Sequence, residues 1–310
     1  MTTRFALLFI ALIFITGWAL SGTMDDTLAV DLIEIPVMEN SLMEDSVSAD
    51  VDPTLSGPET TEALEYPVVR NRAFEFGEHL TFKIRYGFIR AGTAEMKVMA
   101  KIDSSGRKLY HIQTTARSLS SFDWIYKVDD VVNSFVDFRG FYPLRFEKKL
   151  REGSYKADLF VDYFHQDSLA RVEFIRIDKN RKPKIYTVRI PPFVQDILSA
   201  FYFIRTQDLE VGQPIFLSNH EKDKVYDLEV RILKRETVKV SAGKFRCLEV
   251  EPMLQGDEAL FKQKGKMTIW LTDDERKIPV LMKTKIIVGS ITTELIDIKG
   301  VTKDIPAKLD

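Results

Sequence analysis

Residues 79–102, HLTFKIRYGFIRAGTAEMKVMAKI, decide the fold because apolar and polar side chains alternate along almost the whole stretch. From Leu80 to Phe88 every second residue is apolar, and the same period returns from Ala94 to Ile102. A period of two places the apolar side chains on one face of a β-strand and the polar side chains on the other. Ala91-Gly92 separates the two runs and has the composition of a turn. The stretch therefore predicts two neighbouring strands that share one buried face.

The same pattern recurs along the rest of the chain. A third run, from Tyr110 to Ala116, follows the turn-like sequence Ser104-Ser105-Gly106, so the first three strands form an antiparallel meander. Further strands are predicted at 158–163, 171–177, 186–190, 226–233, 237–240, 245–250, 267–271, 280–288 and 291–298. Many short strands at regular spacing are typical of sandwiches and barrels. We predict a mainly β domain, either a curved antiparallel sheet or an open or closed β-barrel-like fold.

Two segments break this rhythm. Residues 118–126, SLSSFDWIY, predict a short helix that begins at a serine cap. Residues 193–205 follow Pro191-Pro192 and predict a second helix, which is apolar around most of its circumference. A helix of that kind is buried on most sides. We expect the sheet to pack around it, with Phe201 among its most buried residues.

The first 22 residues have the features of a secretory signal peptide. Arg4 precedes an apolar run from Phe5 to Leu20, and Ala19 and Ser21 stand three and one residues before a cleavage site. An uncleaved anchor is the alternative, although the run is slightly shorter than the roughly 20 residues that span a bilayer. Thr23 stands where a lipidation motif needs cysteine, so we expect no lipoprotein. Both remaining readings place the chain in the periplasm or otherwise outside the cytoplasm.

Charge divides the chain into an acidic leader and a basic domain. Residues 24–69 hold twelve acidic residues and no lysine or arginine, whereas residues 70–310 hold 34 acidic and 43 basic residues, a net charge of +9. An acidic segment with no apolar period is typical of a disordered linker. We therefore expect a signal peptide at 1–22, a linker at 23–69, a β-rich domain at 70–300 and a C-terminal tail at 301–310.

Several short motifs together resemble a family of exported bacterial proteins known as domain of unknown function 3108. The resemblance runs from Ala73 to about Lys299, and its motifs are Phe76-Gly77-Glu78, Tyr86-Gly87, Ala91-Gly92-Thr93-Ala94, Asp196-Ile197-Leu198-Ser199-Ala200-Phe201-Tyr202, Arg205, Ala242-Gly243-Lys244-Phe245, Trp270-Leu271-Thr272-Asp273-Asp274, Ile278-Pro279-Val280 and Gly289-Ser290. The resemblance implies a β-rich fold and an envelope location. It implies no activity and no catalytic residue.

The motifs of known chemistries are missing from the sequence. The four histidines have no metal-ligand spacing, and no nucleophile elbow or phosphate-binding glycine loop occurs. The single cysteine, Cys247, lies in a strand-like run and reads as a small buried residue. Two adjacent carboxylate pairs, Asp129-Asp130 and Asp273-Asp274, are candidates for acid–base chemistry. Neighbours on a strand face opposite sides, and Asp273-Asp274 has the place and composition of a hairpin turn, so we read both pairs as structural. We predict no catalytic residues, no metal and no cofactor.

Three hypotheses of function remain. The first is a non-enzymatic envelope protein that binds an amphiphilic or anionic ligand, a lipid or cell-wall component, with Arg205 meeting the head group and Trp124 and Tyr202 in contact with the ligand. The second is a structural or assembly factor with a filled core and envelope proteins as partners. The third is a cell-wall or lipid hydrolase that uses unrecognised carboxylates. Export excludes nucleic acid, and membrane contact is expected only through an uncleaved signal segment.

Overall fold

The computed structural model describes residues 64–254, 267–285 and 289–310. Within them, fourteen strands form one antiparallel sheet in the order β8-β7-β6-β5-β4-β3-β2-β1-β14-β13-β12-β11-β10-β9. The strands are β1 His79–Tyr86, β2 Ile89–Ile102, β3 Lys108–Ser118, β4 Asp129–Asp137, β5 Pro143–Glu152, β6 Tyr155–Phe164, β7 Leu169–Arg176, β8 Lys184–Arg189, β9 Ile215–Glu221, β10 Lys224–Val240, β11 Gly243–Leu254, β12 Met267–Thr272, β13 Pro279–Lys285 and β14 Ser290–Lys299. The predicted mainly β fold with an antiparallel sheet is confirmed.

The stretch 79–102 forms the centre of this sheet. Leu80, Phe82 and Ile84 of β1 are fully buried, while the residues between them face outward. β1 pairs with β2 on one side and with β14 on the other, so the first and last strands of the domain are hydrogen-bonded to each other. The turn between β1 and β2 lies at Gly87-Phe88, not at Ala91-Gly92, because β2 already begins at Ile89. The side chain of Phe88 therefore leaves the buried face.

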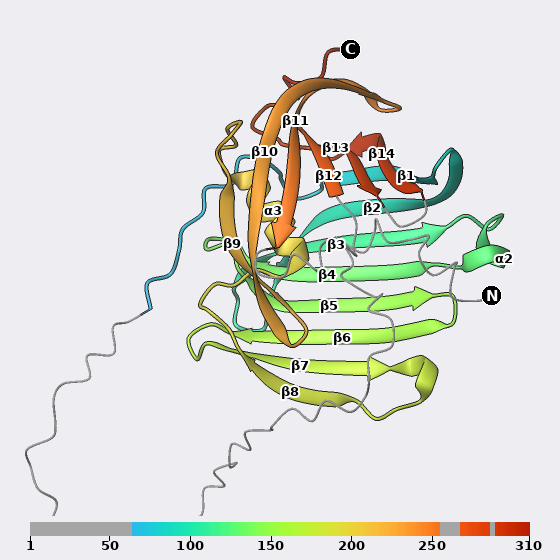
Figure 1. The fold of residues 1–310 in the computed structure, drawn as a ribbon. Helices are drawn as coiled ribbons and strands as arrows, with labels where there is room; N and C mark the ends of the chain where they lie inside the picture. Colours follow the sequence, from blue (N-terminus) through green and yellow to red (C-terminus); the bar gives the residue numbers. More distant parts are fainter. Residues whose placement is uncertain (1–63, 255–266, 286–288) are drawn as a thin grey trace, which may run out of the picture. The chain divides into compact units, whose positions relative to one another are not determined.

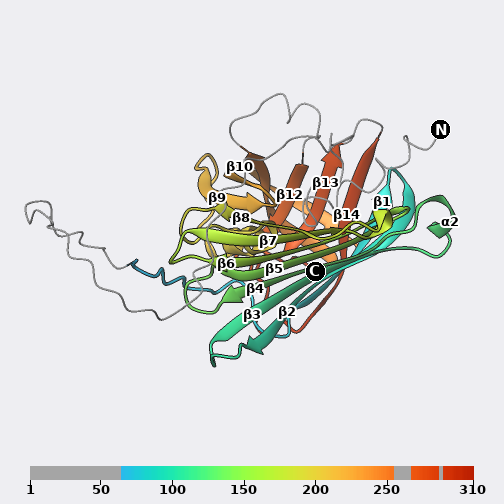
Figure 2. The ribbon, with the colours of Figure 1, turned by 90° about the horizontal axis from the view of Figure 1, so that it is seen from below.

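The sheet bends so that its two halves run in different directions. In Figure 1, β3 to β8 cross the view horizontally, whereas β9 to β14 run steeply across it. The second helix, α3 (Ile197–Thr206), lies where the two halves face each other in Figure 1, and Figure 2 shows the two halves of the sheet from below. It contacts β9 from one half and β4 from the other. The expectation that a curved sheet packs around this helix is confirmed.

The sheet stays open between β8 and β9, which do not pair with each other. Side chains nevertheless join the two halves across the interior. Lys148 Nζ of β5 lies 2.7 Å from Glu221 Oε1 of β9, and the Tyr163 hydroxyl of β6 lies 3.3 Å from His220 Nδ1. Lys222 Nζ lies 4.1 Å from the centre of the Phe174 ring on β7. The domain is thus a curved open sheet with a largely filled interior.

Both helices are shorter than the sequence predicts. α2 spans Asp123–Tyr126, because Ser118 still belongs to β3 and its hydroxyl donates a hydrogen bond to Asp123. α3 begins at Ile197, because Phe193 adopts a positive φ of 58° and Gln195 pairs with Asn219 of β9 as a short parallel bridge. A 3-10 turn, η2 (Ile177–Lys179), connects β7 to β8.

The packed domain extends beyond the expected limits of 70–300. The ring of Tyr66 lies 5.4 Å from that of Phe193, so the packing begins before residue 70. At the other end, Ala307 is fully buried and Lys308 bridges to Phe245 of β11. The expected signal peptide and nearly all of the expected linker lie outside the described residues. In the described part of the chain, no helix is long and apolar enough to cross a membrane.

Candidate functional site

Helix α3 is fixed at its start by a buried acidic cap. The Asp196 carboxylate accepts hydrogen bonds from the backbone N–H groups of Leu198 and Ser199, each at 2.8 Å, and the Ser199 hydroxyl accepts from the Asp196 backbone N–H. The Ser134 hydroxyl of β4 donates to the same carboxylate at 2.5 Å, which ties the helix to the first half of the sheet. Burial raises the pKa of Asp196 to about 6, against the opposing effect of these hydrogen bonds.

The end of α3 is fixed by a buried ion pair. The Arg205 guanidinium donates to both carboxylate oxygens of Glu78, at 2.7 and 2.8 Å, and to the carbonyl oxygen of Arg276 at 3.2 Å. It also lies 5.2 Å from the centre of the Phe74 ring. Burial acts to lower the pKa of Arg205, but the effect of the Glu78 carboxylate is larger, so the pKa of Arg205 is raised. Both side chains are closed to solvent, so the guanidinium is a clamp between the helix and the segment before β1.

The three residues that the sequence suggested for ligand contact do not form one site. Arg205 is engaged by Glu78 and has no path to an external anion. Tyr202 is fully buried beside Arg205 and packs edge-on against Phe74, and burial raises the pKa of its hydroxyl. Trp124 is 82% exposed on α2, and Figure 1 places α2 at one end of β3 and β4, away from α3.

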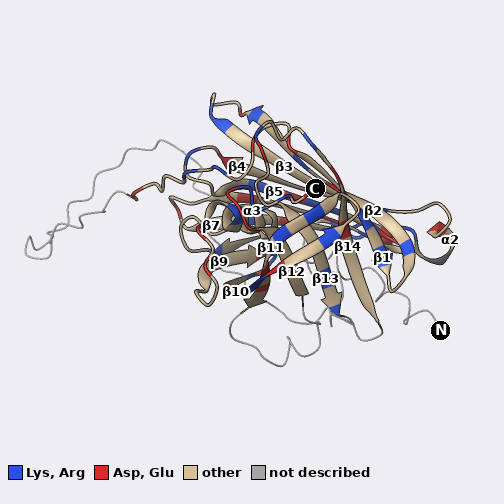
Figure 3. Ribbon diagram, turned by 90° about the horizontal axis from the view of Figure 1, so that it is seen from above, with Lys and Arg blue, Asp and Glu red and all other residues tan. Residues whose placement is uncertain are grey.

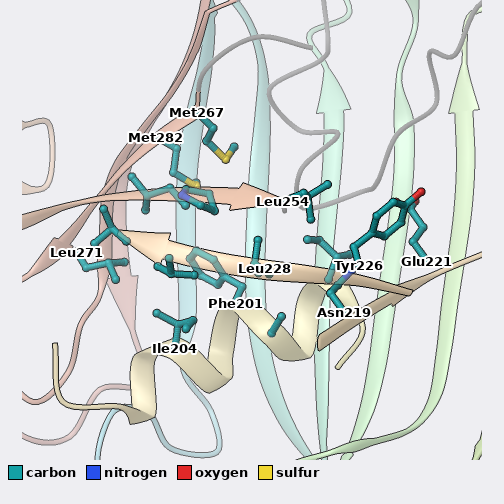
Figure 4. Close-up of a pocket in the computed structure, with 16 residues that line it drawn as sticks. Phe201, Ile204, Asn219, Glu221, Tyr226, Leu228, Leu254, Met267, Leu271 and Met282 are labelled. Atoms are coloured by element: carbon teal, nitrogen blue, oxygen red, sulfur yellow. The ribbon is translucent and has the colours of Figure 1, made fainter. Parts of the chain in front are cut away.

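A cavity lies instead on the other side of α3. It is enclosed between the helix and the second half of the sheet, and Figure 4 shows Phe201 and Ile204 of α3 facing Leu228 and Leu271 of the sheet. The cavity has a volume of about 820 Å³, which includes a part that is open to solvent. Its lining residues are Ile197, Ala200, Phe201, Ile204, Asn219, Glu221, Tyr226, Leu228, Val230, Val250, Pro252, Leu254, Met267, Ile269, Leu271 and Met282.

The cavity explains an unexpected feature of α3. Phe201 is only partly buried, whereas Leu198 and Tyr202 are completely buried. The prediction that Phe201 is among the most buried residues is therefore wrong. Its ring faces the cavity, and the side chains of Leu198 and Tyr202 fill the packed side of the helix.

Three polar residues interrupt the otherwise apolar lining. Asn219 is 3% exposed, and its Oδ1 atom has no hydrogen-bond partner. A buried acceptor without a partner costs roughly 1–3 kcal/mol, so this atom favours a ligand or water that donates a hydrogen bond. Glu221 is paired with Lys148, and burial raises the pKa of Tyr226 to about 12, which keeps its hydroxyl protonated. These residues present a carboxylate, a phenol and an amide to the cavity.

A second buried polar cluster lies on β4 and β5, away from the cavity lining. Glu152 and Asp130 are hydrogen-bonded to each other, and burial raises the pKa of Glu152 to about 8 and that of Asp130 to about 6. Burial and the repulsion between the two carboxylates thus both favour the protonated form of Glu152. Asp129, the sequence neighbour of Asp130, is exposed and pairs with Arg117. The Asp129-Asp130 pair is thus divided between two faces of the strand.

The other chemical candidates have structural roles. Asp274 Oδ1 accepts hydrogen bonds from the Thr272 hydroxyl and from the backbone N–H groups of Arg276 and Lys277, as a turn residue does. Cys247 is buried, and burial raises the pKa of its thiol to about 12. Among the described residues, no group of three His, Cys, Asp or Glu side chains could hold a metal ion.

Sequence reasoning missed Glu78 and Asn219 as important residues. Glu78 lies 127 positions from Arg205, and nothing in the helix sequence indicates so distant a partner. Asn219 lies in β9, where the run Ser218-Asn219-His220-Glu221 reads as a polar loop. A buried polar residue on a strand leaves no periodic signal.

Comparison with known proteins identifies the family. The profile of the family described as protein of unknown function DUF3108 matches residues 81–296, and the chain belongs to this family. A search among curated proteins found no significant match.

Similar solved structures were also found. They include a β-barrel-like protein of domain of unknown function 1849 from Brucella abortus, with 10% identity, a TM-score of 0.43, and coverage of 76% of this chain and 98% of that chain. A protein from Bacteroides fragilis described as exported, with a YmcC-like fold, has 11% identity, a TM-score of 0.31 and coverage of 76% and 99%. A protein from Parabacteroides distasonis described as a lipoprotein has 12% identity, a TM-score of 0.33 and coverage of 76% and 100%.

Proposed function

We propose that this member of the DUF3108 family is an exported, non-enzymatic protein that binds the apolar part of an amphiphile in the cavity between α3 and strands β9 to β13. The observation that carries the proposal is an apolar cavity kept open beside a helix whose opposite side is fully packed. Ligand sites in proteins are typically concave and apolar with a few placed polar groups. The signal-like sequence at 1–22 supports an envelope location.

The polar groups of the cavity favour one class of amphiphile. Asn219 supplies a free acceptor and Glu221 a carboxylate, and the lysine that contacts this carboxylate, Lys148, is already paired with it. An acyl or other hydrocarbon chain that ends in a hydroxyl or amine group fits this arrangement better than an anionic head group. The earlier suggestion of an anionic group at Arg205 is not kept, because Glu78 holds that side chain.

A volume-filling variant tests the proposal. Ala200 lines the cavity and is almost completely buried, so Ala200→Leu places three additional carbon atoms in the cavity while keeping a good helix former on α3. We expect at least a tenfold loss of affinity for N-phenyl-1-naphthylamine, an apolar fluorescent probe. Phe203→Leu is the control, because Phe203 lies on α3 outside the lining and packs near Phe141. Equal probe binding by the parent and Ala200→Leu would refute the cavity as the site.

The natural ligand is identified by mass analysis of molecules that copurify with the protein from its native envelope. We expect a hydrocarbon-bearing compound in the parent protein and its depletion in Ala200→Leu. The absence of any such compound from both proteins would favour the assembly-factor hypothesis.

One observation supports that second hypothesis. β8 is an edge of the sheet, and its outer backbone groups have no neighbouring strand among the described residues. Such an edge can accept a strand from a partner protein. Lys184 and Arg189 at its two ends are side chains that natural sheets use to discourage such pairing, so we rank this function second.

A further inference from the structure

Four connections between neighbouring strands lie together at one end of the sheet. Because successive strands are antiparallel, the β1–β2, β3–β4, β5–β6 and β7–β8 connections all lie at the same end. Backbone hydrogen bonds join neighbouring connections there: Leu119 N–H donates to the Ala91 carbonyl at 2.9 Å, and Gly153 N–H donates to the Lys127 carbonyl at 2.7 Å. We call this surface the α2 end and define it by residues 87–91, 119–128, 153–154 and 177–183.

Two aromatic side chains project from the α2 end. Phe88 is 92% exposed in the β1–β2 turn, and Trp124 is 82% exposed on α2. They are the two most exposed large apolar side chains of the described residues, and Ile89 and Ile177 of the same end are also exposed. The Trp124 indole N–H donates to the Ser121 carbonyl at 3.0 Å, which holds the ring on the outside of its short helix. Figures 1 and 2 both place the β1–β2 turn and α2 at the same end.

Basic side chains lie in the same connections as these aromatic residues and in the β7–β8 connection. Arg90, Lys127, Lys179, Arg181 and Lys182 are exposed at the α2 end. The acidic residues there are Asp123, which accepts a hydrogen bond from Ser118, and Asp178, which is paired with Arg176. Elsewhere on the sheet, positive and negative residues are interspersed along the strands, as Figure 3 shows.

The opposite end of the sheet provides an internal comparison. Its connections, residues 103–107, 138–142 and 165–168, carry two acidic and two basic side chains. Two of their aromatic residues, Phe141 and Tyr142, are buried. The exposed apolar residues there are Ile102 and Phe164 at strand ends, and Tyr66 and Val68 in the segment that packs on Arg139 and Tyr142. Isolated exposed apolar side chains are ordinary, whereas projecting aromatic residues within a basic surface are not.

A membrane surface fits this arrangement better than a protein partner. A stable protein interface buries roughly 800 Å² on each partner in a continuous contact. The α2 end instead presents side chains from separate turns, and such side chains can each enter the interfacial layer of a bilayer. Tryptophan is enriched at that layer, and nearby lysines and arginines are attracted to anionic lipids.

We propose that the α2 end docks the domain on an anionic lipid bilayer, with Phe88 and Trp124 inserted at the interface and the surrounding lysines and arginines on the lipid head groups. The contact belongs to the folded domain itself, in addition to any contact made by the signal segment. It is independent of the cavity and of what the cavity binds.

Tryptophan fluorescence tests the insertion directly. The chain has three tryptophans, at positions 18, 124 and 270, and Trp270 is largely buried. In a Trp18→Phe background, quenching by brominated lipids therefore reports Trp124. With vesicles of phosphatidylglycerol and phosphatidylcholine at a 3:7 ratio, we expect strong quenching by shallow bromines, which disappears when phosphatidylcholine is used alone. Binding to the anionic vesicles without quenching of Trp124 would overturn the proposal.

Matched variants locate the contact. Phe88→Ser combined with Trp124→Ser should weaken sedimentation with the anionic vesicles at least tenfold, and Arg90→Glu combined with Lys127→Glu should do the same. Ile102→Ser at the opposite end is the control and should bind like the parent. All substituted side chains are exposed, so thermal unfolding should be unchanged and binding of N-phenyl-1-naphthylamine by the cavity should persist. An equal loss in Ile102→Ser, or a parent dimer that Phe88→Ser dissociates, would overturn the proposal, the second result in favour of a protein interface.

Discussion

The buried pair of Arg205 and Glu78 shows how one residue can be misread from its sequence position. A basic residue in the last turn of a helix suits the helix dipole, which contributes about 0.3–1 kcal/mol. Here the guanidinium is removed from solvent and held by two hydrogen bonds to one carboxylate. The loss of one partner would leave the other as an uncompensated buried charge, which is much more costly than the loss of a dipole interaction.

Arg205→Ala should therefore lower the free energy of unfolding by about 3–5 kcal/mol, measured by urea denaturation. A double variant, Arg205→Met with Glu78→Leu, replaces the pair by apolar side chains of similar length and should recover most of that loss. A loss below about 1 kcal/mol in Arg205→Ala would mean that the pair is not buried in solution.

The carboxyl pair of Glu152 and Asp130 links stability to pH. Burial raises the pKa of both groups, so the folded protein binds more protons than the unfolded chain between about pH 4 and pH 8. The free energy of unfolding therefore falls as the pH rises through this window. Burial lowers the pKa of His220 to about 4, which gives the opposite slope between about pH 4 and 6.5. Above about pH 6.5 the titration of His220 no longer changes the free energy of unfolding, whereas that of Glu152 still does.

Between pH 6.5 and 8 the free energy of unfolding should decrease by about 1–2 kcal/mol, since one group contributes at most about 1.4 kcal/mol per pH unit. The glutamine of Glu152→Gln cannot ionise, so this variant should lack the slope. Its free energy of unfolding should therefore rise relative to that of the parent as the pH increases. Glu147→Gln, on the solvent-facing side of the same strand, is the control and should retain the slope of the parent. Urea titrations at three pH values measure the effect, and a flat profile in the parent would contradict it.

At the scale of elements, α3 has one packed side and one side that faces the cavity. Leu198→Ala removes a completely buried side chain and should cost about 2–5 kcal/mol. Phe201→Ala removes a ring that borders the cavity and should cost less, about 1–3 kcal/mol, although more atoms are deleted. Chemical denaturation of the two variants measures which of them loses more free energy of unfolding. A greater loss in Phe201→Ala would show that the cavity is closed around the ring.

Strands with a clean period of two were predictable, and strands with buried polar residues were not. β1, β2 and β3 follow their apolar patterns closely. β5 was missed because Lys148 and Glu152 occupy its inner face together with Phe146 and Leu150. β4 and β9 were missed for related reasons, since Asp130, Ser134, Asn219 and His220 are all buried. The two strands predicted at 226–233 and 237–240 are one strand, β10, which a bulge near Leu233 interrupts.

At the scale of the whole molecule, the cavity was beyond sequence reasoning. Its lining comes from α3 and five strands between Asn219 and Met282, and each strand contributes residues that belong to an ordinary apolar face. Whether such faces meet tightly or leave a space depends on how the two halves of the sheet bend toward each other. The pattern of residues fixes which face is buried, but the curvature sets the distance between the buried faces.

The start of the packed domain gives the last prediction. Tyr66 packs against Tyr142 and Phe193, and the Val69 N–H donates to the Arg139 carbonyl at 2.8 Å. Residues 24–62 carry only acidic charge and no periodic apolar pattern, so we expect their deletion to leave the melting temperature within about 2 °C of the parent.

Deletion of residues 24–70 also removes the Tyr66 and Val69 contacts, worth about 2 kcal/mol together, and should lower the melting temperature by about 4–8 °C. Differential scanning calorimetry of the two deletions locates the boundary. A large drop in the shorter deletion would show that the acidic leader stabilises the basic domain, and its reversal by 0.5 M salt would identify the interaction as electrostatic.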